Sequence, residues 1–406
     1  MLKQFSVNII WYGGSQIIRS LVPFVMLPIL TRYLDTTSYG VLSLIEVFIL
    51  FLFPLVSINI HSAINIQFFK LNKENLNEYI SNAISLSFGV FVVVSILFFI
   101  LKDFISKQFK LNEILIILLP MMAVLRVYPQ IILSMYQAQM KAIKYFLFTL
   151  SQSIVEFILS IVFVVILLQG YIGRLEGTYI TFLIFSIISI YILTKSNLIG
   201  KFKFKYTKQI LNYGVFLIPH AISGIIMAMS DRFFISYFYN NSDVGIYTVS
   251  YQLAAILLLV GVSINKAWST YLFRMLKSNS IQITKYILSI YSVFIIFFFI
   301  ILMSKNIIFD ILTTDKFLEA KQYFIYLLLG FLFQIFYMII TNFLFYYEKT
   351  KVLALITFSG AMLNLILNYV LIKQIGVKGV AIATMITWIY YFCVVLIIVK
   401  NYKQWE

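Results

Sequence analysis

Apolar stretches of about twenty residues recur along almost the whole chain and leave few folds open to it. A helix of that length can cross the hydrocarbon core of a bilayer. Because lipid offers the backbone no hydrogen bonds, only helices and closed barrels span membranes. We predict twelve membrane-spanning helices, over residues 8–31, 41–64, 80–101, 113–136, 145–168, 174–194, 210–238, 244–265, 282–303, 320–346, 352–372 and 376–399.

The composition indicates a protein with little mass outside the bilayer. Of its 406 residues, 62% are hydrophobic and 11% are charged, whereas a soluble domain is about one quarter charged. The longest connecting segments, 195–209 and 304–319, are too short to fold as domains. Enzymes that act on lipid-linked substrates usually place their chemistry in a larger loop, so we predict a protein that is not an enzyme.

Cysteine and histidine are too scarce for a disulfide framework or a metal cluster. The chain has one cysteine, Cys393, and two histidines, His61 and His220, so we expect neither a metal site nor a cofactor. The first residues run directly into the first apolar stretch without a signal-peptide cleavage site. We therefore expect the first span to stay in the mature protein.

The distribution of charge predicts the orientation of the chain in the membrane. With the N-terminus inside, eighteen lysines and arginines fall on the inner side against four acidic residues, and eleven fall outside against nine. By the positive-inside rule, both termini are cytoplasmic. We interpret the net charge of +16 as a topology signal and expect no nucleic-acid partner. The basic loop 195–208 is also suited to contact anionic lipid headgroups.

The two halves of the sequence resemble each other. The segment RYLDTTSYGVLSL, after the first span, aligns with SYFYNNSDVGIYTV, after the seventh, and pairs Gly40 with Gly245. Since each half holds six predicted spans, the repeats share one orientation. We predict an N-terminal six-helix bundle over residues 1–200 and a C-terminal one over 201–406, with a central cavity suited to alternating access.

The first predicted span carries features that a helix facing only lipid does not need. Arg19 lies within it, together with Pro23 and Pro28. A charge inside a membrane normally faces protein or a water-filled cavity, and proline frees a backbone carbonyl. We predict a broken, cavity-lining helix. Arg19 either pairs with Glu46 or Glu156 to fix helix packing, or presents a cation to an anionic substrate.

Other charged residues within the first-half spans allow the same two interpretations. Arg126 stands between Pro120 and Pro129 and is a second candidate for binding an anion. Glu156 lies mid-span, where a carboxylate either pairs with an arginine or binds and releases a coupling proton. Glu46, nearer a span end, is a weaker candidate for ion coupling.

The seventh span supplies the candidates of the second half. Its sequence IPHAISGIIMAMSDRFFI contains Pro219, which we predict to break the helix early, and His220, Asp231 and Arg232. Adjacent residues point in different directions on a helix. We therefore consider Asp231 for ion coupling and Arg232 for substrate binding. His220 is either a substrate or proton ligand, or a hydrogen-bonded packing residue.

Two asparagines share one face of the eleventh span. Asn364 and Asn368 are four residues apart, and amides inside membranes commonly join helices. We predict a structural role for both. The 28 tyrosines and 40 phenylalanines are expected to be mostly lipid-facing or interfacial.

Three motifs carry a resemblance to a known family. They are the N-terminal WYGGSQIIRSLVPFVMLPILTRYLDTTSYG, the second-half SDRFFISYFYNNSDVGIYTVSYQLA and the closing GVKGVAIATMITW. With them the chain resembles the O-antigen and capsule repeat-unit translocases of the Wzx type. These form the polysaccharide branch of the multidrug/oligosaccharidyl-lipid/polysaccharide exporter superfamily. The resemblance covers essentially the whole length.

The resemblance implies an all-α polytopic membrane protein with about twelve helices in two pseudo-symmetric six-helix bundles, in the V shape of the MATE exporters. It implies a flippase for an undecaprenyl-pyrophosphate-linked oligosaccharide in the bacterial inner membrane. Candidate protein partners are the polysaccharide polymerase and the glycosyltransferases, and we expect a monomer. The chain lacks the two extra helices of the lipid II flippases and, unlike the drug exporters, an obvious acidic ion site in the first span.

We therefore predict an anion-binding set that would substitute for the hydration of a pyrophosphate. It comprises Arg19, Arg126 and Arg232, with Arg32 at the outer mouth. A drug or cation exporter of the same fold is the alternative, and it predicts acids along the cavity. A membrane polymerase or ligase is a third hypothesis, but it requires a long outer loop that the sequence does not contain.

Overall fold

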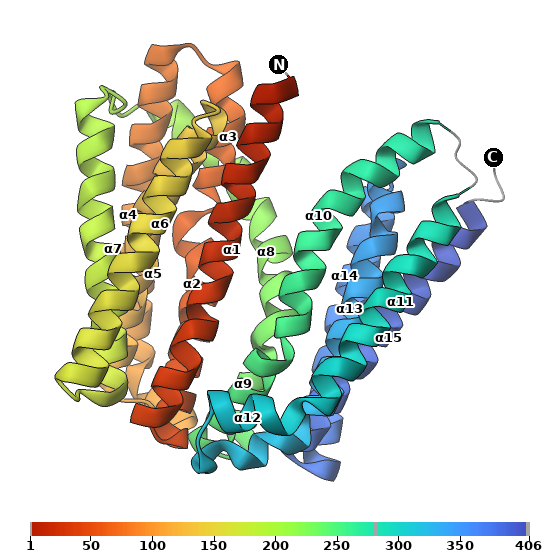
Figure 1. Cartoon of the computed structure of the whole chain (residues 1–406). Helices are drawn as coiled ribbons and strands as arrows, with labels where there is room; N and C mark the ends of the chain where they lie inside the picture. Colours follow the sequence, from red (N-terminus) through yellow and green to blue (C-terminus); the bar gives the residue numbers. More distant parts are fainter. Residues whose placement is uncertain (1, 279–281, 403–406) are drawn as a thin grey trace. The chain divides into compact units, whose positions relative to one another are not determined.

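The structure is a computed structural model that describes residues 2–278 and 282–402, and the described residues form helices joined by short turns. The chain folds as two compact units (Figure 1). Unit 1 comprises Met1–Met26 and Val41–Ile225, and unit 2 comprises Leu27–Gly40 and Ile226–Glu406. Two long helices, α1 (Leu2–Tyr33) and α8 (Phe204–Phe238), begin in unit 1 and end in unit 2.

Each unit is built around one central helix. The other elements of unit 1 are α2 (Thr36–Ser57, whose first residues belong to unit 2), α3 (Ile60–Lys70), α4 (Lys73–Phe109), α5 (Glu113–Ala138), α6 (Ala142–Ile161), the π-helical turn η1 (Val162–Ile166) and α7 (Gly170–Lys195). The other elements of unit 2 are α9 (Asn241–Ala254), α10 (Ile256–Lys277), α11 (Ile283–Met303), α12 (Lys305–Leu312), the 3-10 turn η2 (Asp315–Ala320), α13 (Lys321–Tyr346), α14 (Thr350–Ile375) and α15 (Val377–Tyr402).

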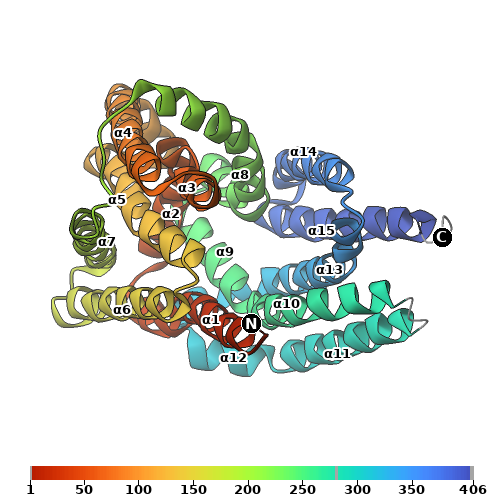
Figure 2. The same ribbon diagram turned by 90° about the horizontal axis from the view of Figure 1, so that it is seen from above.

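The central helices are α5 and α13. In unit 1, α5 packs against α3, α4 and α7, and most of its second half is buried. In unit 2, α13 packs against α15, α10 and α9, and Figure 2 shows it between α15 and α10. Buried aromatic residues such as Phe324 and Phe331 fill the contacts of α13.

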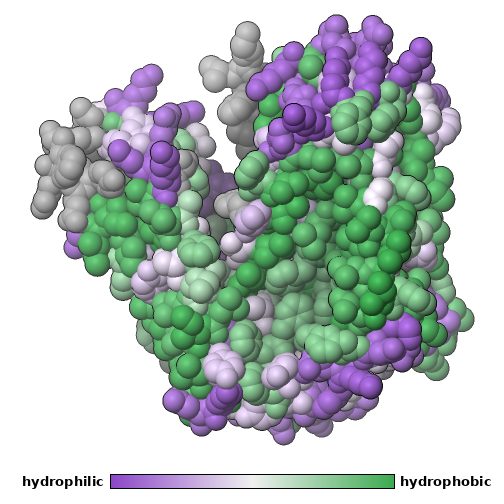
Figure 3. All heavy atoms as spheres, turned by 180° about the vertical axis from the view of Figure 1, so that it is seen from behind, coloured by the Kyte–Doolittle hydropathy of each residue, from purple (hydrophilic) through white to green (hydrophobic). Residues whose placement is uncertain are grey.

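The fold class predicted from the sequence is confirmed. Among the residues that the structure describes, twelve helical segments are long and apolar enough to cross a membrane, and each overlaps one predicted span. On the face drawn in Figure 3, apolar residues occupy the middle and hydrophilic residues gather at the top and bottom. The eighth prediction, 244–265, is displaced from the observed Ile256–Lys277. The helix is interrupted at Ala255, and the preceding α9 contains several polar residues.

The predicted breaks at proline are wrong. Helix α1 runs without interruption through Pro23 and Pro28, and α8 through Pro219. A proline inside a helix removes one hydrogen bond and bends the helix, but neighbouring turns can keep it continuous. Because Pro23 has no N–H, the carbonyl of Arg19 loses its usual helical partner.

An interruption occurs instead in the second span, between α2 and α3. Ile58 and Asn59 have φ values of 46° and 51° there, in the left-handed region that side chains with a Cβ rarely adopt. The Ile58 carbonyl faces α8 so closely that a Cβ on Gly214 would lie 2.0 Å from its oxygen. The first part of α8 is thereby held against unit 1.

The segment before α8 is also attached to unit 1. The Gly200 N–H donates to Ser81 Oγ at 2.8 Å, and Lys203 pairs with the buried Glu78 at 2.5 Å. The sequence places a bundle boundary at 200/201, whereas the first part of α8 belongs to unit 1. The assignment of 1–200 and 201–406 to two bundles stays a prediction.

The repeat seen in the sequence forms matching helix starts. Asp35 precedes α2 and accepts a hydrogen bond from the Ser38 N–H at 2.7 Å. Asn240 precedes α9 and accepts one from the Asp243 N–H at 2.9 Å. Both residues act as N-caps, which satisfy an N–H group at the first turn of a helix.

These two helix starts also cross each other within unit 2. A Cβ on Gly40 would lie 1.7 Å from the Asn241 carbonyl oxygen, and one on Gly245 would lie 2.0 Å from that of Thr36. The Thr36 and Ser242 hydroxyls are 2.7 Å apart. The glycines that align in the sequence therefore let two equivalent backbones touch.

Candidate functional site

Two ion pairs connect helices of unit 1 within the predicted spans. Arg126 on α5 donates two parallel hydrogen bonds to Glu46 on α2, at 2.9 and 2.8 Å. Its guanidinium carbon also lies 4.8 Å from the centre of the Phe182 ring. A bidentate pair of this kind is among the stronger ionic contacts in proteins. Its two charges cancel, so Arg126 is not free to meet an anion in this state.

A second pair connects α6 with α7. Arg174 donates to Glu156 at 2.8 Å and also to Ser160. Thr178 donates to the same Glu156 oxygen at 3.4 Å. The two pairs also interact electrostatically, because Glu156 acts on Arg126 and Arg174 acts on Glu46. Both candidate carboxylates of unit 1 therefore have arginine partners.

Arg19 has no such partner. Its side chain is half-buried on α1, and it forms no hydrogen bond or ion pair with any residue that the structure describes. The sequence suggested Glu46 and Glu156 as its possible partners. Both carboxylates form salt bridges with other arginines instead. Arg32, in the last turn of α1, is exposed.

Unit 2 holds one fully buried carboxylate among neutral polar groups. Asp231 on α8 has no exposed surface. Its Oδ2 accepts hydrogen bonds from the Tyr247 hydroxyl and, at 3.0 Å, from the Thr384 hydroxyl. Its Oδ1 accepts one from Asn368 Nδ2 at 3.2 Å. Helices α8, α9, α14 and α15 each contribute one of these four residues.

Further oxygen atoms extend this cluster along α14 and α15. Asn364 Oδ1 accepts from Asn368 at 3.0 Å and from Ser230 at 3.3 Å. Asn364 Nδ2 in turn donates to the Thr387 hydroxyl at 3.4 Å. Asn368 Oδ1 is buried and has no hydrogen-bond partner among the described residues. The cluster is thus rich in oxygen atoms, and one of these acceptors, Asn368 Oδ1, has no described donor.

Arg232 follows Asp231 but is held apart from it by the helix. It is 2% exposed, donates to the Ala228 carbonyl at 3.0 Å and stacks over the Tyr251 ring at 4.3 Å. Its Nε has no hydrogen-bond partner among the described residues. Arg232 and Asp231 interact electrostatically, and the arginine therefore partly balances the buried negative charge.

The structure brings together some of the predicted residues and separates others. Glu46 meets Arg126, but Glu156 meets Arg174, which is not among the residues that the sequence suggested as partners. Asn364 and Asn368 do join helices, as predicted, but they do so around Asp231. The sequence indicated this role because Asn364 and Asn368 are four residues apart and so lie on the same face of one helix. The side chain of His220 lies outside the described residues.

The chemistry of the Asp231 cluster suits a small cation or a proton. Carboxylate, amide and hydroxyl oxygens are ligands for hard cations, whereas the sulfur and imidazole ligands of transition metals do not occur in it. The described residues contain no group of three or more histidine, cysteine or acidic side chains that could hold a metal ion. Asp231 is hydrogen-bonded to neutral donors, and Arg232 balances its charge only in part, which leaves the cluster compatible with one added positive charge.

Fold and site together define a multi-pass helical membrane protein. Two solved structures share its fold. One is an inward-facing multidrug resistance MATE family transporter of the MOP superfamily, with a TM-score of 0.70, 14% identity and coverage of 98% of this chain and 96% of that one. The other is the lipid II flippase MurJ in an inward closed conformation, with a TM-score of 0.73, 19% identity and coverage of 97% and 87%.

The family follows from the sequence comparisons. The family model described as "Polysaccharide biosynthesis protein" matches residues 5–276, and the chain belongs to this family. A second model, MatE, matches residues 219–370. A Haemophilus influenzae protein described as "Lsg locus putative protein 1" is 27% identical in an alignment of 420 positions that covers 96% of this chain and 98% of that one. The resemblance to the polysaccharide branch of the superfamily is confirmed.

Proposed function

We propose that this protein is a flippase that moves an undecaprenyl-pyrophosphate-linked oligosaccharide repeat unit across the bacterial inner membrane by alternating access. The family match and the shared fold support a transporter of a lipid-linked substrate. The single observation that carries the proposal is Arg19, a cation within a membrane span that no described carboxylate neutralises.

The reason is the charge of the pyrophosphate. A multiply charged anion loses its hydration when it leaves water, and cationic side chains in a sheltered site can replace that hydration. The planar guanidinium of arginine suits phosphate oxygens better than the point charge of lysine does. The guanidinium of Arg19 donates to no described residue and could therefore bind phosphate oxygens. Arg126, by contrast, already donates two parallel hydrogen bonds to Glu46.

Arg32 and Arg232 have subordinate roles in the proposal. Arg32 is exposed at the end of α1, and the predicted topology places it at the outer mouth, where a departing headgroup would meet it. Arg232 is buried against Tyr251, so it acts on the substrate only if unit 2 rearranges. His220 stays a candidate from the sequence.

Ion coupling is assigned to Asp231. Its carboxylate and the unsatisfied Asn368 oxygen belong to one cluster, and a proton or sodium ion between them would satisfy both. Glu46 and Glu156 are less suited to this role because arginines already balance their charges.

A genetic experiment tests the transport step. In a deletion strain, lipid-linked oligosaccharide should accumulate on the cytoplasmic leaflet, and the wild-type gene should clear it. Arg19→Gln should lower transport by about 10- to 100-fold, the equivalent of one or more hydrogen bonds to a charged group. Arg19→Lys should retain part of the activity. Normal surface polysaccharide in the deletion strain would overturn the proposal.

A drug or cation exporter is the second candidate, because the MatE model matches part of the chain and MATE structures share the fold. That function would require an acid available to a cationic substrate. Glu46 and Glu156 are paired with arginines, and Asp231 has no exposed surface that a drug-sized cation could reach. These three span carboxylates therefore favour the anionic substrate. Raised sensitivity of the deletion strain to cationic dyes, with normal polysaccharide, would favour the exporter.

A further inference from the structure

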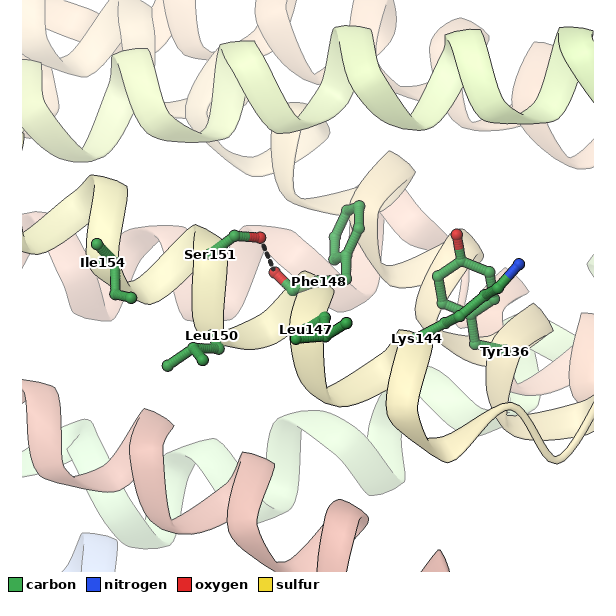
Figure 4. A pocket seen from close by; sticks show the side chains of 7 residues that line it. All are labelled: Tyr136, Lys144, Leu147, Phe148, Leu150, Ser151 and Ile154. Carbon is green, nitrogen blue, oxygen red and sulfur yellow. Dashed lines mark hydrogen bonds between the residues drawn. The ribbon is translucent and has the colours of Figure 1, made fainter.

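A groove on the surface of unit 1 follows one face of α6. Its volume is about 450 Å³, and its lining includes Lys144, Leu147, Leu150 and Ile154 from α6 and Tyr136 from the end of α5. Figure 4 shows Lys144 and Tyr136 at one end of this lining and Ile154 at the other, with Ser151 between them.

The two ends of the groove differ in chemistry. Lys144 is exposed and forms no ion pair with a described residue, and Tyr136 lines the same groove. Beyond them the lining is mostly apolar, with one hydroxyl group, that of Ser151, and Leu147 and Ile154 are 55% and 47% exposed. One end can therefore bind an anion, and the rest offers apolar surface to a hydrocarbon chain.

The dimensions favour a single tail. Ten residues of α-helix separate Lys144 from Ile154, a distance of about 15 Å. The aliphatic residues form one row along one helix face. One cationic head site with one apolar row matches an anionic lipid that has a single long chain better than a phospholipid with two acyl chains.

The position also matches the side from which the substrate would arrive. Lys144 follows the short turn between α5 and α6, which the charge distribution assigns to the cytoplasmic side. A sugar unit assembled in the cytoplasm would reach the protein in this leaflet.

We propose that the α6 groove is a loading site for the carrier lipid, with Lys144 binding the diphosphate and the row from Leu147 to Ile154 holding the first part of the polyprenyl chain. This inference rests on the proposed function and names the part of the substrate that the groove binds. It is separate from Arg19, which acts within the membrane.

Binding of undecaprenyl diphosphate to the full chain in phosphatidylcholine nanodiscs tests the head site. Lys144→Gln should weaken binding by about 3- to 10-fold, because the contact is charged but partly exposed. Lys144→Arg should bind like the wild type. Lys141→Gln removes a charge from the same turn without touching the groove lining and should change binding less than twofold.

A matched pair of substitutions tests the apolar row. Ile154 lines the groove, whereas Ile158 lies one turn further along α6, outside the lining, with a similar exposure of 51%. Ile154→Trp should fill the row and weaken binding by about fivefold, and Ile158→Trp should not. A photoreactive side chain at Ser151 should capture the lipid in native membranes, which keeps the test valid if a variant misfolds.

The results separate this inference from the proposed function. If Lys144→Gln and Ile154→Trp both bind undecaprenyl diphosphate as the wild type does, and no lipid is captured at Ser151, the groove is not a loading site. The proposed flippase function would not be affected by that result. Equal competition by phosphatidylglycerol would mean that the groove takes an ordinary phospholipid, which also refutes it. No wild-type binding of undecaprenyl diphosphate at all would contradict the proposed function itself.

Discussion

Unit 1 holds the span carboxylates Glu46 and Glu156 in ion pairs with arginine, whereas unit 2 holds Asp231 in hydrogen bonds to neutral hydroxyl and amide groups. In unit 1, Glu46 and Glu156 each have an arginine within 2.8 Å. In unit 2, Asp231 has no ion pair within the described chain and is bonded to Tyr247, Thr384 and Asn368. An ion pair is already neutral, so binding a cation would first require breaking it. A carboxylate among neutral donors can take up one positive charge without losing a partner.

The largest expected effect is at Asp231. Asp231→Asn removes the charge but keeps an oxygen that can accept a hydrogen bond, so the protein should fold. Gradient-driven transport should fall by about 10- to 100-fold, the range for losing contacts to a charged group. Transport into vesicles with and without an ionophore measures it.

Glu156→Gln is the matched control for that prediction. Arg174 already balances Glu156, so the amide should leave the response to the ionophore unchanged. If Glu156→Gln uncouples transport and Asp231→Asn does not, the assignment of the two units is reversed.

The next effect concerns the crossing of α2 and α9. A Cβ on Gly40 would lie 1.7 Å from the Asn241 carbonyl oxygen, so Gly40→Ala must push two helices apart. We expect a loss of about 1–3 kcal/mol of unfolding free energy, as for other overpacked contacts. Thermal unfolding in detergent measures it. Gly89→Ala, where a Cβ meets nothing within 4 Å, should be neutral or slightly stabilising.

A double-mutant cycle examines the paired charges of unit 1. Glu46→Gln alone leaves Arg126 without its carboxylate and should lower stability by about 1–3 kcal/mol, the cost of leaving one partner of a hydrogen-bonded pair unsatisfied. The double variant with Arg126→Gln should regain most of that loss. Independent, additive losses in the two single variants would show that the pair is not a unit.

The smallest expected effect is a difference in pH dependence between the two helix N-caps, Asp35 and Asn240. Hydrogen bonds from Ser38 lower the pKa of Asp35, so the Asp35 carboxylate stabilises the fold above the ordinary carboxyl range. This contribution is lost as the pH falls through the lowered pKa. Asp35→Ala should therefore cost about 0.5–2 kcal/mol at pH 7 and less in acid. Asn240→Ala should cost a similar amount at every pH, and parallel pH curves for the two variants would contradict this account.

The sequence predicted the spans well and the helix interruptions poorly. Apolar length is a local property, so each of the twelve predicted spans overlaps a helix. Proline suggested breaks at Pro23 and Pro219, but the helices continue there and stop instead at Ile58 and Ala255. The Ile58 break lies where Gly214 of α8 approaches closely, a contact that no pattern near Ile58 reveals.

The sequence likewise identified some residues of the candidate site and missed others. The sequence singled out Glu46, Arg126, Glu156 and Asp231 because charges are rare inside spans. It did not select Thr384 or Tyr247, whose residue types are common in this chain. These become notable only through their hydrogen bonds to Asp231.

By itself, the sequence determined that this is a helical membrane protein with twelve spans, an internal repeat and a few charges that need partners. Only the tertiary structure decided the partners, because they lie far apart along the chain. Glu46 and Arg126 are 80 residues apart, and Asp231 and Thr384 are 153 apart. Hydrophobic length acts within one helix, whereas charge neutralisation depends on which helices pack together. The same packing left Arg19 without a described carboxylate and gave Asp231 a neutral polar surrounding.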